Sequence, residues 1–206
     1  DGAALRCTGA ECPAQLLRNL IHFASRDAMD IDGLGPAILE QLLQAGMVAS
    51  PADLYTLQVA QLEKLDRFGK KSAENLVAAV ERSKQNDLYR LVYALGIPHI
   101  GAKAAQVLCG AFPTMEAIQN APEEELSQIE GFGGIMSQEV AAFFQKESAR
   151  ALVSRLKELG VNMAAQQQEA KGTLLAGKPF VLTGTLPTMS RKEASRLIEE
   201  NGGKVT

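Results

Sequence analysis

The sequence predicts a mainly α-helical fold in which one short helical unit occurs four times, followed by a short α/β segment. Three observations predict it: a pentapeptide that returns at nearly constant spacing, amphipathic stretches on both sides of each copy, and a strand-like composition near the C-terminal end. A unit of about 30 residues buries its apolar face only by packing against its neighbours. We therefore expect one compact helical domain and a separate second segment.

The repeated pentapeptide has the pattern apolar, polar or proline, variable, apolar, glycine. Its four copies are turn 1 (Ile31–Gly35), turn 2 (Leu65–Gly69), turn 3 (Ile97–Gly101) and turn 4 (Ile129–Gly133). The final glycines are 34, 32 and 32 residues apart. Two apolar positions and one glycine held in register four times indicate a structural repeat.

Apolar residues at i, i+3 and i+4 flank every turn, as in amphipathic helices. Examples before and after turn 1 are Leu16, Leu17, Leu20 and Ile21, then Ile38, Leu39, Leu42 and Leu43. Segments that begin with proline and acidic residues, at 51–53 and 122–125, favour further helix starts between the units. Each unit is thus predicted to be a helix, a tight turn and a second helix.

The final glycines, Gly35, Gly69, Gly101 and Gly133, suggest a binding role. Glycine permits a positive φ in a tight turn and, lacking Cβ, lets another backbone approach. The helix that follows presents unpaired N–H groups and its positive dipole end. We therefore predict phosphate cradles that ignore base identity. The candidate contact residues are Gly33, Gly35, Arg67, Gly69, Lys70, Lys71, His99, Gly101, Lys103, Gly131 and Gly133.

Glycine turns also join packed helices without binding anything. On that interpretation, a lone turn histidine such as His99 is structural. The repetition of the pattern favours the binding interpretation. The second apolar residues of the turns are expected to be core anchors without a ligand role: Leu34, Phe68, Ile100 and Phe132. Turns 1 and 4 lack a lysine directly after the glycine, so they would bind phosphate through backbone amides alone.

Composition limits the possible functions. The chain has 21 Lys and Arg against 24 Asp and Glu, a net charge of −3, so any nucleic-acid binding must be local rather than driven by bulk charge. The sequence contains no long uncharged apolar run, so no membrane-spanning helix is predicted. Three cysteines, an odd number, fit a reducing cytoplasm. Because the chain begins at Asp1, we expect it to be a piece of a longer protein.

Two cysteines near the beginning, Cys7 and Cys12, enclose four residues. Such a pair is either half of a tetrahedral zinc site or two free thiols, and the pair alone does not decide between these. Cys109 lies within an apolar helical face and is expected to be a buried free thiol.

The C-terminal segment changes character. Residues 163–172 form a polar, aperiodic stretch that we interpret as a linker. Residues 178–183 have the composition of a short strand, and Ser190 with Glu193 form a capping box that begins a helix. That helix should end at 201–203, before a second, parallel strand at 204–206.

The four turns resemble helix-hairpin-helix motifs, and four of them in about a hundred residues resemble the corresponding domain of bacterial NAD-dependent DNA ligases. The phrases 28–35 and 95–101 resemble that family specifically. Residues 180–185 and 201–205 resemble the start of a BRCT domain, and residues 6–15 resemble the second half of the four-cysteine zinc module of these ligases.

The resemblance implies a domain order. Residues 1–14 would close the zinc module, with Cys7 and Cys12 as structural zinc ligands and the other cysteine pair upstream. Residues 15–162 would be the helix-hairpin-helix DNA-binding domain, 163–172 a linker, and 173–206 the truncated N-terminal part of a BRCT-like domain. The fold class is then tandem helix-hairpin-helix repeats in one compact domain, followed by a truncated α/β segment.

The resemblance also implies a function. The parent would be a cytoplasmic, monomeric ligase that seals nicks in double-stranded DNA during replication and repair, using NAD and magnesium. The family's adenylated lysine stands in a Lys-x-Asp-Gly motif that these 206 residues lack. No catalytic or cofactor-binding residue is therefore expected here. This segment would clamp nicked duplex without reading sequence, and it would supply orientation rather than reactive groups.

Other functions remain open. A non-catalytic repair protein with tandem hairpins explains residues 28–146 equally well, but it leaves the cysteine pair and the BRCT-like segment unexplained. A protein-interaction scaffold fits the acidic net charge but leaves four cradle-like turns without a purpose. A hydrolase finds little support, because the two histidines have no nucleophile or metal pattern around them.

Overall fold

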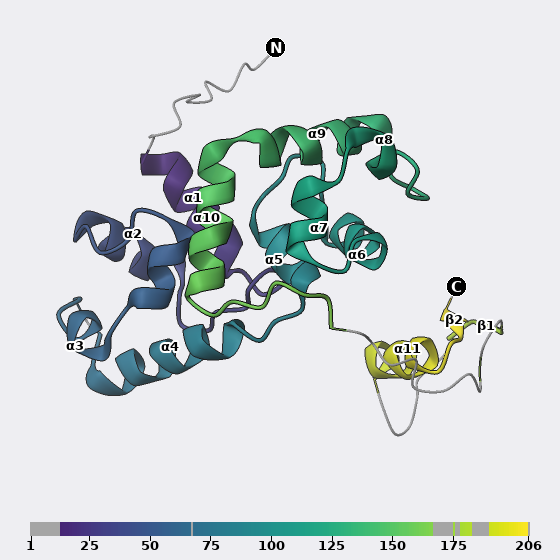
Figure 1. The fold of residues 1–206 in the computed structure, drawn as a ribbon. Helices are drawn as coiled ribbons and strands as arrows, with labels where there is room; N and C mark the ends of the chain where they lie inside the picture. Colours follow the sequence, from purple (N-terminus) through teal and green to yellow (C-terminus); the bar gives the residue numbers. More distant parts are fainter. Residues whose placement is uncertain (1–12, 67, 167–174, 176–177, 183–189, 206) are drawn as a thin grey trace, which may run out of the picture. The chain divides into compact units, whose positions relative to one another are not determined.

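A computed structural model of the chain describes residues 13–66, 68–166, 175, 178–182 and 190–205. The chain divides into two compact units that meet between Ala165 and Gln166. The regular secondary structure in the described part of unit 1 is helical (Figure 1). Its helices are α1 (Pro13–Ala24), α2 (Pro36–Gln44), the 3₁₀ helix η1 (Pro51–Thr56), α3 (Val59–Leu62), α4 (Lys70–Ser83), α5 (Leu88–Ala94), α6 (Ala102–Ala111), α7 (Met115–Asn120), α8 (Glu123–Leu126), α9 (Gly134–Gln145) and α10 (Glu147–Glu158).

The fourfold repeat is confirmed. Turn 1 joins α1 to α2, turn 2 joins α3 to α4, turn 3 joins α5 to α6, and turn 4 joins α8 to α9. The two helices of each unit pack against one another. The first helix varies from 12 residues in α1 to 4 in α3 and α8, so the turn is better preserved than the helix before it.

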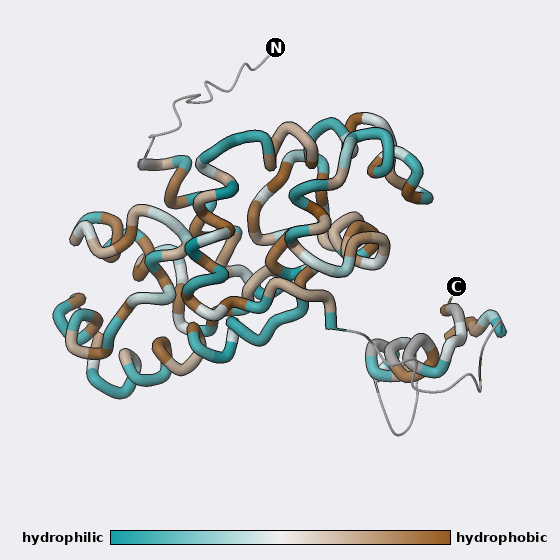
Figure 2. The backbone as a smooth tube through the Cα atoms, viewed as in Figure 1, coloured by the Kyte–Doolittle hydropathy of each residue, from teal (hydrophilic) through white to brown (hydrophobic). Residues whose placement is uncertain are grey.

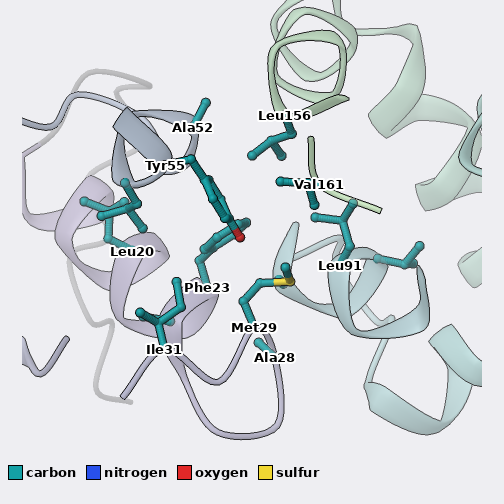
Figure 3. Packing of buried hydrophobic residues seen from close by; sticks show 14 of the residues in the cluster. Leu20, Phe23, Ala28, Met29, Ile31, Ala52, Tyr55, Leu91, Leu156 and Val161 are labelled. Carbon is teal, nitrogen blue, oxygen red and sulfur yellow. The ribbon is translucent and has the colours of Figure 1, made fainter. Parts of the chain in front are cut away.

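One hydrophobic core connects the repeats. Hydrophobic and hydrophilic residues alternate along the helices, as amphipathic packing requires (Figure 2). Figure 3 shows Leu20 and Phe23 of α1 beside Tyr55 of η1, with Leu91 of α5 and Leu156 of α10 on the other side. Leu20, Phe23 and Leu156 are fully buried. The four turns are therefore carried by a single packed body rather than by four separate hairpins.

The late helix α10 was not singled out by the sequence analysis, although Val153 and Leu156 mark its apolar face. Both side chains are buried, and α10 packs against α9 and against the much earlier η1. The guanidinium of Arg155 forms an ion pair of 2.6 Å with Asp53 of η1. This helix ties the end of unit 1 to its first half.

Residues 161–165 form a strap along the surface of unit 1. The N–H of Met115 donates to the carbonyl of Met163 (2.9 Å), and the N–H of Ala165 donates to the carbonyl of Pro113 (2.8 Å). The N–H of Asn162 donates to the carbonyl of Lys84 (2.8 Å). The first residues of the segment interpreted as a linker, 163–165, are thus hydrogen-bonded to unit 1.

Unit 2 has the predicted order of strand, helix and parallel strand. Strand β1 (Pro179–Phe180) pairs in parallel with β2 (Lys204–Val205), and α11 (Arg191–Glu200) connects them. The capping box is confirmed: the carboxylate of Glu193 accepts from the N–H of Ser190 (2.8 Å), and the Ser190 hydroxyl accepts from the N–H of Glu193 (3.2 Å). Strand β1 is shorter than the predicted 178–183, of which residue 183 lies outside the described part.

In the described part of the chain, no helix has the length and apolar character that crossing a membrane requires.

Candidate nucleic-acid interface

The four turns share one hydrogen bond. In each, the N–H of the fourth residue donates to the carbonyl of the first, at 3.3, 3.3, 3.1 and 2.9 Å in turns 1 to 4. The third residue has a positive φ in the three turns where it is described: Gly33 (85°), His99 (62°) and Gly131 (79°). This combination is typical of a type II turn, which also favours Pro98 at the second position. The equivalent Arg67 lies outside the described residues.

The final glycines differ from the prediction in one respect. We expected them to supply the positive φ, but Gly35, Gly69, Gly101 and Gly133 have φ between −75° and −81°. The type II turn places the left-handed residue two positions earlier. Each final glycine is instead the N-cap of the following helix, with an extended backbone that any residue adopts.

Nothing in the described part of unit 1 requires glycine at these four N-caps. All four are exposed, and an added Cβ would meet no described atom within 4 Å. Serine, asparagine or aspartate would cap the helix better. Within the described residues, no side chain caps α2, α4, α6 or α9. The turns therefore leave backbone surface and helix-start N–H groups open to an external acceptor.

The apolar residues of the turns anchor them, as predicted. Leu34, Ile100 and Phe132 are buried, and Phe68 is half-buried against the same core. Because the anchors point inward, the glycine that follows each of them is held at the surface.

Cations distinguish the turns from one another. Lys70 and Lys71 stand exposed on the first turn of α4, and Lys103 stands exposed on the first turn of α6. Within the described residues, no ion pair engages them. The equivalent first turns of α2 and α9 carry no cation. Turns 2 and 3 thus combine a glycine N-cap with lysine, whereas turns 1 and 4 offer the backbone alone.

A cleft of about 480 Å³ with a mixed polar and apolar lining lies between turn 1 and α4, and the sequence analysis missed its polar side chains. Gly33 lines one side, and Ser72, Asn75 and Arg82 of α4 line the other. The three α4 side chains are exposed, and no hydrogen bond or ion pair engages them among the described residues. The polar spacing of Ser72 and Asn75 beside turn 2 was the available signal, because residues three apart share a helix face.

Side chains of α5 and of the loop before α5 hydrogen-bond to the segment that leads into turn 1. The Arg90 side chain donates to the carbonyls of Ala28 (2.7 Å) and Arg26, and the Asn86 amide donates to the carbonyl of Met29 (2.7 Å). These bonds fix the strained loop that contains Asp30, whose φ is 51°. They therefore connect the first pair of turns to the second.

The cysteine predictions have separate outcomes. Cys7 and Cys12 lie outside the described residues, so their zinc role stays a prediction. Cys109 is a buried free thiol, as expected. Its burial, with a contribution from the charge of Asp87, raises the pKa of the thiol to about 12. The described residues contain no cluster of metal-binding side chains.

The comparisons agree with this geometry. A family model described as a SAM-like helix-hairpin-helix tandem matches residues 25–82, and a helix-hairpin-helix motif model matches residues 90–153. The first covers turns 1 and 2, and the second covers turns 3 and 4. A model of the BRCA1 C-terminus (BRCT) domain matches residues 170–206.

Curated DNA ligases resemble the chain over its whole length. The DNA ligase of Thermoanaerobacter pseudethanolicus is 50% identical over 204 residues, which are 99% of this chain and 31% of that protein. The DNA ligase of Anoxybacillus flavithermus is 51% identical over 209 residues, which are 100% of this chain and 31% of that protein. The chain is homologous to part of the bacterial DNA ligases. It spans about a third of the length of the ligases it matches.

Proposed function

We propose that this chain is the part of a DNA ligase that binds double-stranded DNA through its backbone phosphates. The observation that carries the proposal is the set of four exposed glycine N-caps that neither the backbone conformation nor internal packing requires. An anion is favoured at a helix N-terminus by free N–H groups and by the helix dipole. A Cβ-free N-cap lets a bulky phosphodiester come close.

The contacts would position the duplex without reading its sequence, because phosphate contacts carry no base information. Lys70, Lys71 and Lys103 would add charge-assisted contacts at turns 2 and 3. His99, at the third position of turn 3, would lie beside the same phosphate, and Arg67 stays a candidate contact from the sequence. Holding both strands around a nick would present the broken ends to a separate catalytic domain.

The parent protein, on this proposal, seals nicks during DNA replication and repair in the bacterial cytoplasm and acts as a monomer. It would use NAD and magnesium at a catalytic domain that is not part of these residues. Cys7 and Cys12 are the residues that would hold a structural zinc ion, since two close thiolates fit half of a closed tetrahedral set. Cys109 does not fit it, because it is buried in the core of unit 1.

The test is binding of the 206-residue chain to a nicked duplex, measured by fluorescence anisotropy over a series of salt concentrations. The logarithm of the association constant should fall linearly with the logarithm of salt, with a slope of about −0.9 per phosphate neutralised by a lysine or arginine. Gly69→Val and Gly101→Val should each weaken binding about tenfold while circular dichroism shows an intact fold.

Gly110→Val is the matched control, because Gly110 is also exposed and an added Cβ there would meet no described atom within 4 Å, but it lies near the end of α6. This variant should bind like the parent. If binding does not depend on salt, or if the folded turn variants bind as well as Gly110→Val, the turns are packing elements. A protein-interaction scaffold would then be the better interpretation.

A further inference from the structure

Turn 4 differs from its equivalents at one register position. The second residue after the N-cap glycine is Lys71 after turn 2 and Lys103 after turn 3, but it is Ala37 after turn 1 and Ile135 after turn 4. All four are exposed. Since the four turns share the same i to i+3 hydrogen bond and an extended glycine N-cap, these side chains occupy equivalent positions on the first turn of the following helix.

Ile135 is unusually exposed for its size. Its exposed fraction is 67%, whereas Val107, the next large apolar side chain so exposed in the described part of unit 1, has 37%. The two residues before it, Gly133 and Gly134, have no side chains, and a Cβ at either would meet no described atom within 4 Å. Ile135 therefore stands alone beside bare backbone, which favours contact with an external apolar surface.

We propose that Ile135 packs against a deoxyribose of bound duplex DNA, next to the phosphate held at turn 4. This inference rests on the proposed function of the glycine turns. A phosphate at the Gly133 N-cap is covalently joined to a sugar on each side, so an apolar side chain two residues away lies beside a sugar face. The same register position that meets phosphate with lysine in turns 2 and 3 meets sugar with isoleucine in turn 4.

The charges near turn 4 offer no ionic contact to the DNA backbone, so any attraction there must come from the apolar side chain and the backbone N–H groups. Its second residue, Glu130, is exposed, and the neighbouring helix α8 exposes Glu123, Glu124 and Glu125. No cation in residues 123–137 offsets them. A contact through Ile135 releases no counterions, so its contribution to affinity should be independent of salt. Turn 4 would then hold the duplex at salt concentrations where the lysine contacts weaken.

The experiment measures binding of the 206-residue chain and its variants to nicked duplex DNA over a series of salt concentrations. For each protein it compares the intercept and the slope of the logarithm of the association constant plotted against the logarithm of salt. Ile135→Ser should weaken binding about fivefold at every salt concentration, with the slope unchanged. Ile135→Lys recreates the register of turns 2 and 3, so it should steepen the slope by about 0.9 and strengthen binding at low salt. Ala151→Ser and Ala151→Lys, at an exposed position of α10 away from the turns, are the matched controls and should do neither.

Lys71→Gln separates this inference from the proposed function. It should make the slope shallower by about 0.9 if turn 2 holds a phosphate. If it does so while both Ile135 variants match their Ala151 controls, turn 4 does not touch DNA and the inference is wrong, although the proposed function stands. Its apolar, acidic surface would then suit a protein partner. If the parent binds without salt dependence and Lys71→Gln changes nothing, the proposed function fails and this inference fails with it.

Discussion

Turns 2 and 3 differ from turns 1 and 4 in the charge at the start of the helix that follows. All four combine an i to i+3 hydrogen bond, an apolar anchor and a glycine N-cap. Only turns 2 and 3 add lysines. The matched tandem at 25–82 contains turns 1 and 2, and the match at 90–153 contains turns 3 and 4. Each pair therefore contains one cationic and one uncharged helix start. The free energy of DNA binding would then have a salt-dependent part from the first and a salt-independent part from the second.

The largest expected effect tests whether the lysines make that difference. Replacing Lys71 and Lys103 together by glutamine should remove two counterion-releasing contacts and make the salt slope shallower by about 1.8, which corresponds to about 60-fold weaker binding at 0.1 M salt. Ala37→Lys should have the opposite effect, by about 0.9 in slope, if turn 1 also holds a phosphate. Anisotropy titrations at four salt concentrations measure both changes. Equal slopes for all variants would show that the lysines are ordinary solvated surface.

A second prediction separates the third position of the turn from the fifth. Gly131 has a φ of 79°, whereas Gly133 has a φ of −75°. Gly131→Ala should therefore destabilise the fold by about 1–2 kcal/mol, because a left-handed conformation is strained for alanine. Gly133→Ala should change stability by less than about 0.5 kcal/mol, since its entropic gain offsets the loss of a good N-cap. Urea unfolding of both variants decides this, and equal losses would show that the two glycines have the same structural role.

The repeat and its helices were predictable because periodicity reports burial directly. The spacing of the pentapeptide located all four turns, and the apolar stripes located the helices beside them. The position of the positive φ was not predictable, because glycine occupies both the third and fifth positions of turns 1 and 4. His99 in the left-handed conformation of turn 3 is what shows that the third position carries the strain.

The cleft beside α4 and the role of α10 were missed for another reason. Both depend on which segments meet in space: Ser72 and Asn75 face turn 1, and Arg155 meets Asp53 more than a hundred residues earlier. Local pattern gives a helix its apolar face but does not name the element that covers it. The register of Ile135 with Lys71 and Lys103 was visible in the sequence, but it gained meaning only when all three proved exposed on equivalent helix starts.

A third prediction concerns the start of η1, where the carboxylate of Asp53 accepts hydrogen bonds from backbone N–H groups. Burial raises the pKa of Asp53, but hydrogen bonds from the Ala49 N–H, the Ser50 hydroxyl and the Ser50 N–H, together with the charge of Arg155, outweigh it and lower the pKa below 3.8. A lowered folded-state pKa gives stability that is present above the unfolded-state value and is lost as pH falls through the folded-state value.

Asp53→Asn should therefore cost about 1 kcal/mol at pH 7, and the deficit should shrink as pH falls below about 4. Urea unfolding of both proteins from pH 7 to pH 3 measures it. Glu63→Gln, at an exposed position of the same half, is the control and should show no such convergence. A deficit that stays constant with pH would show that the charge of Asp53 does not stabilise η1.

The smallest expected change gives the sharpest contrast between capped and bare helix starts. Gly69→Ser places a better N-cap at a position where φ is −79° and an added Cβ meets no described atom within 4 Å. The variant should be more stable than the parent by about 0.5 kcal/mol, because serine caps slightly better and restricts the unfolded chain. It should nevertheless bind DNA more weakly, since the serine side chain occupies the N–H groups and the space that a phosphate needs. Urea unfolding and anisotropy on the same samples measure both quantities. If stability and DNA affinity rise together, the bare glycine is not kept for phosphate, and turn 2 only joins α3 to α4.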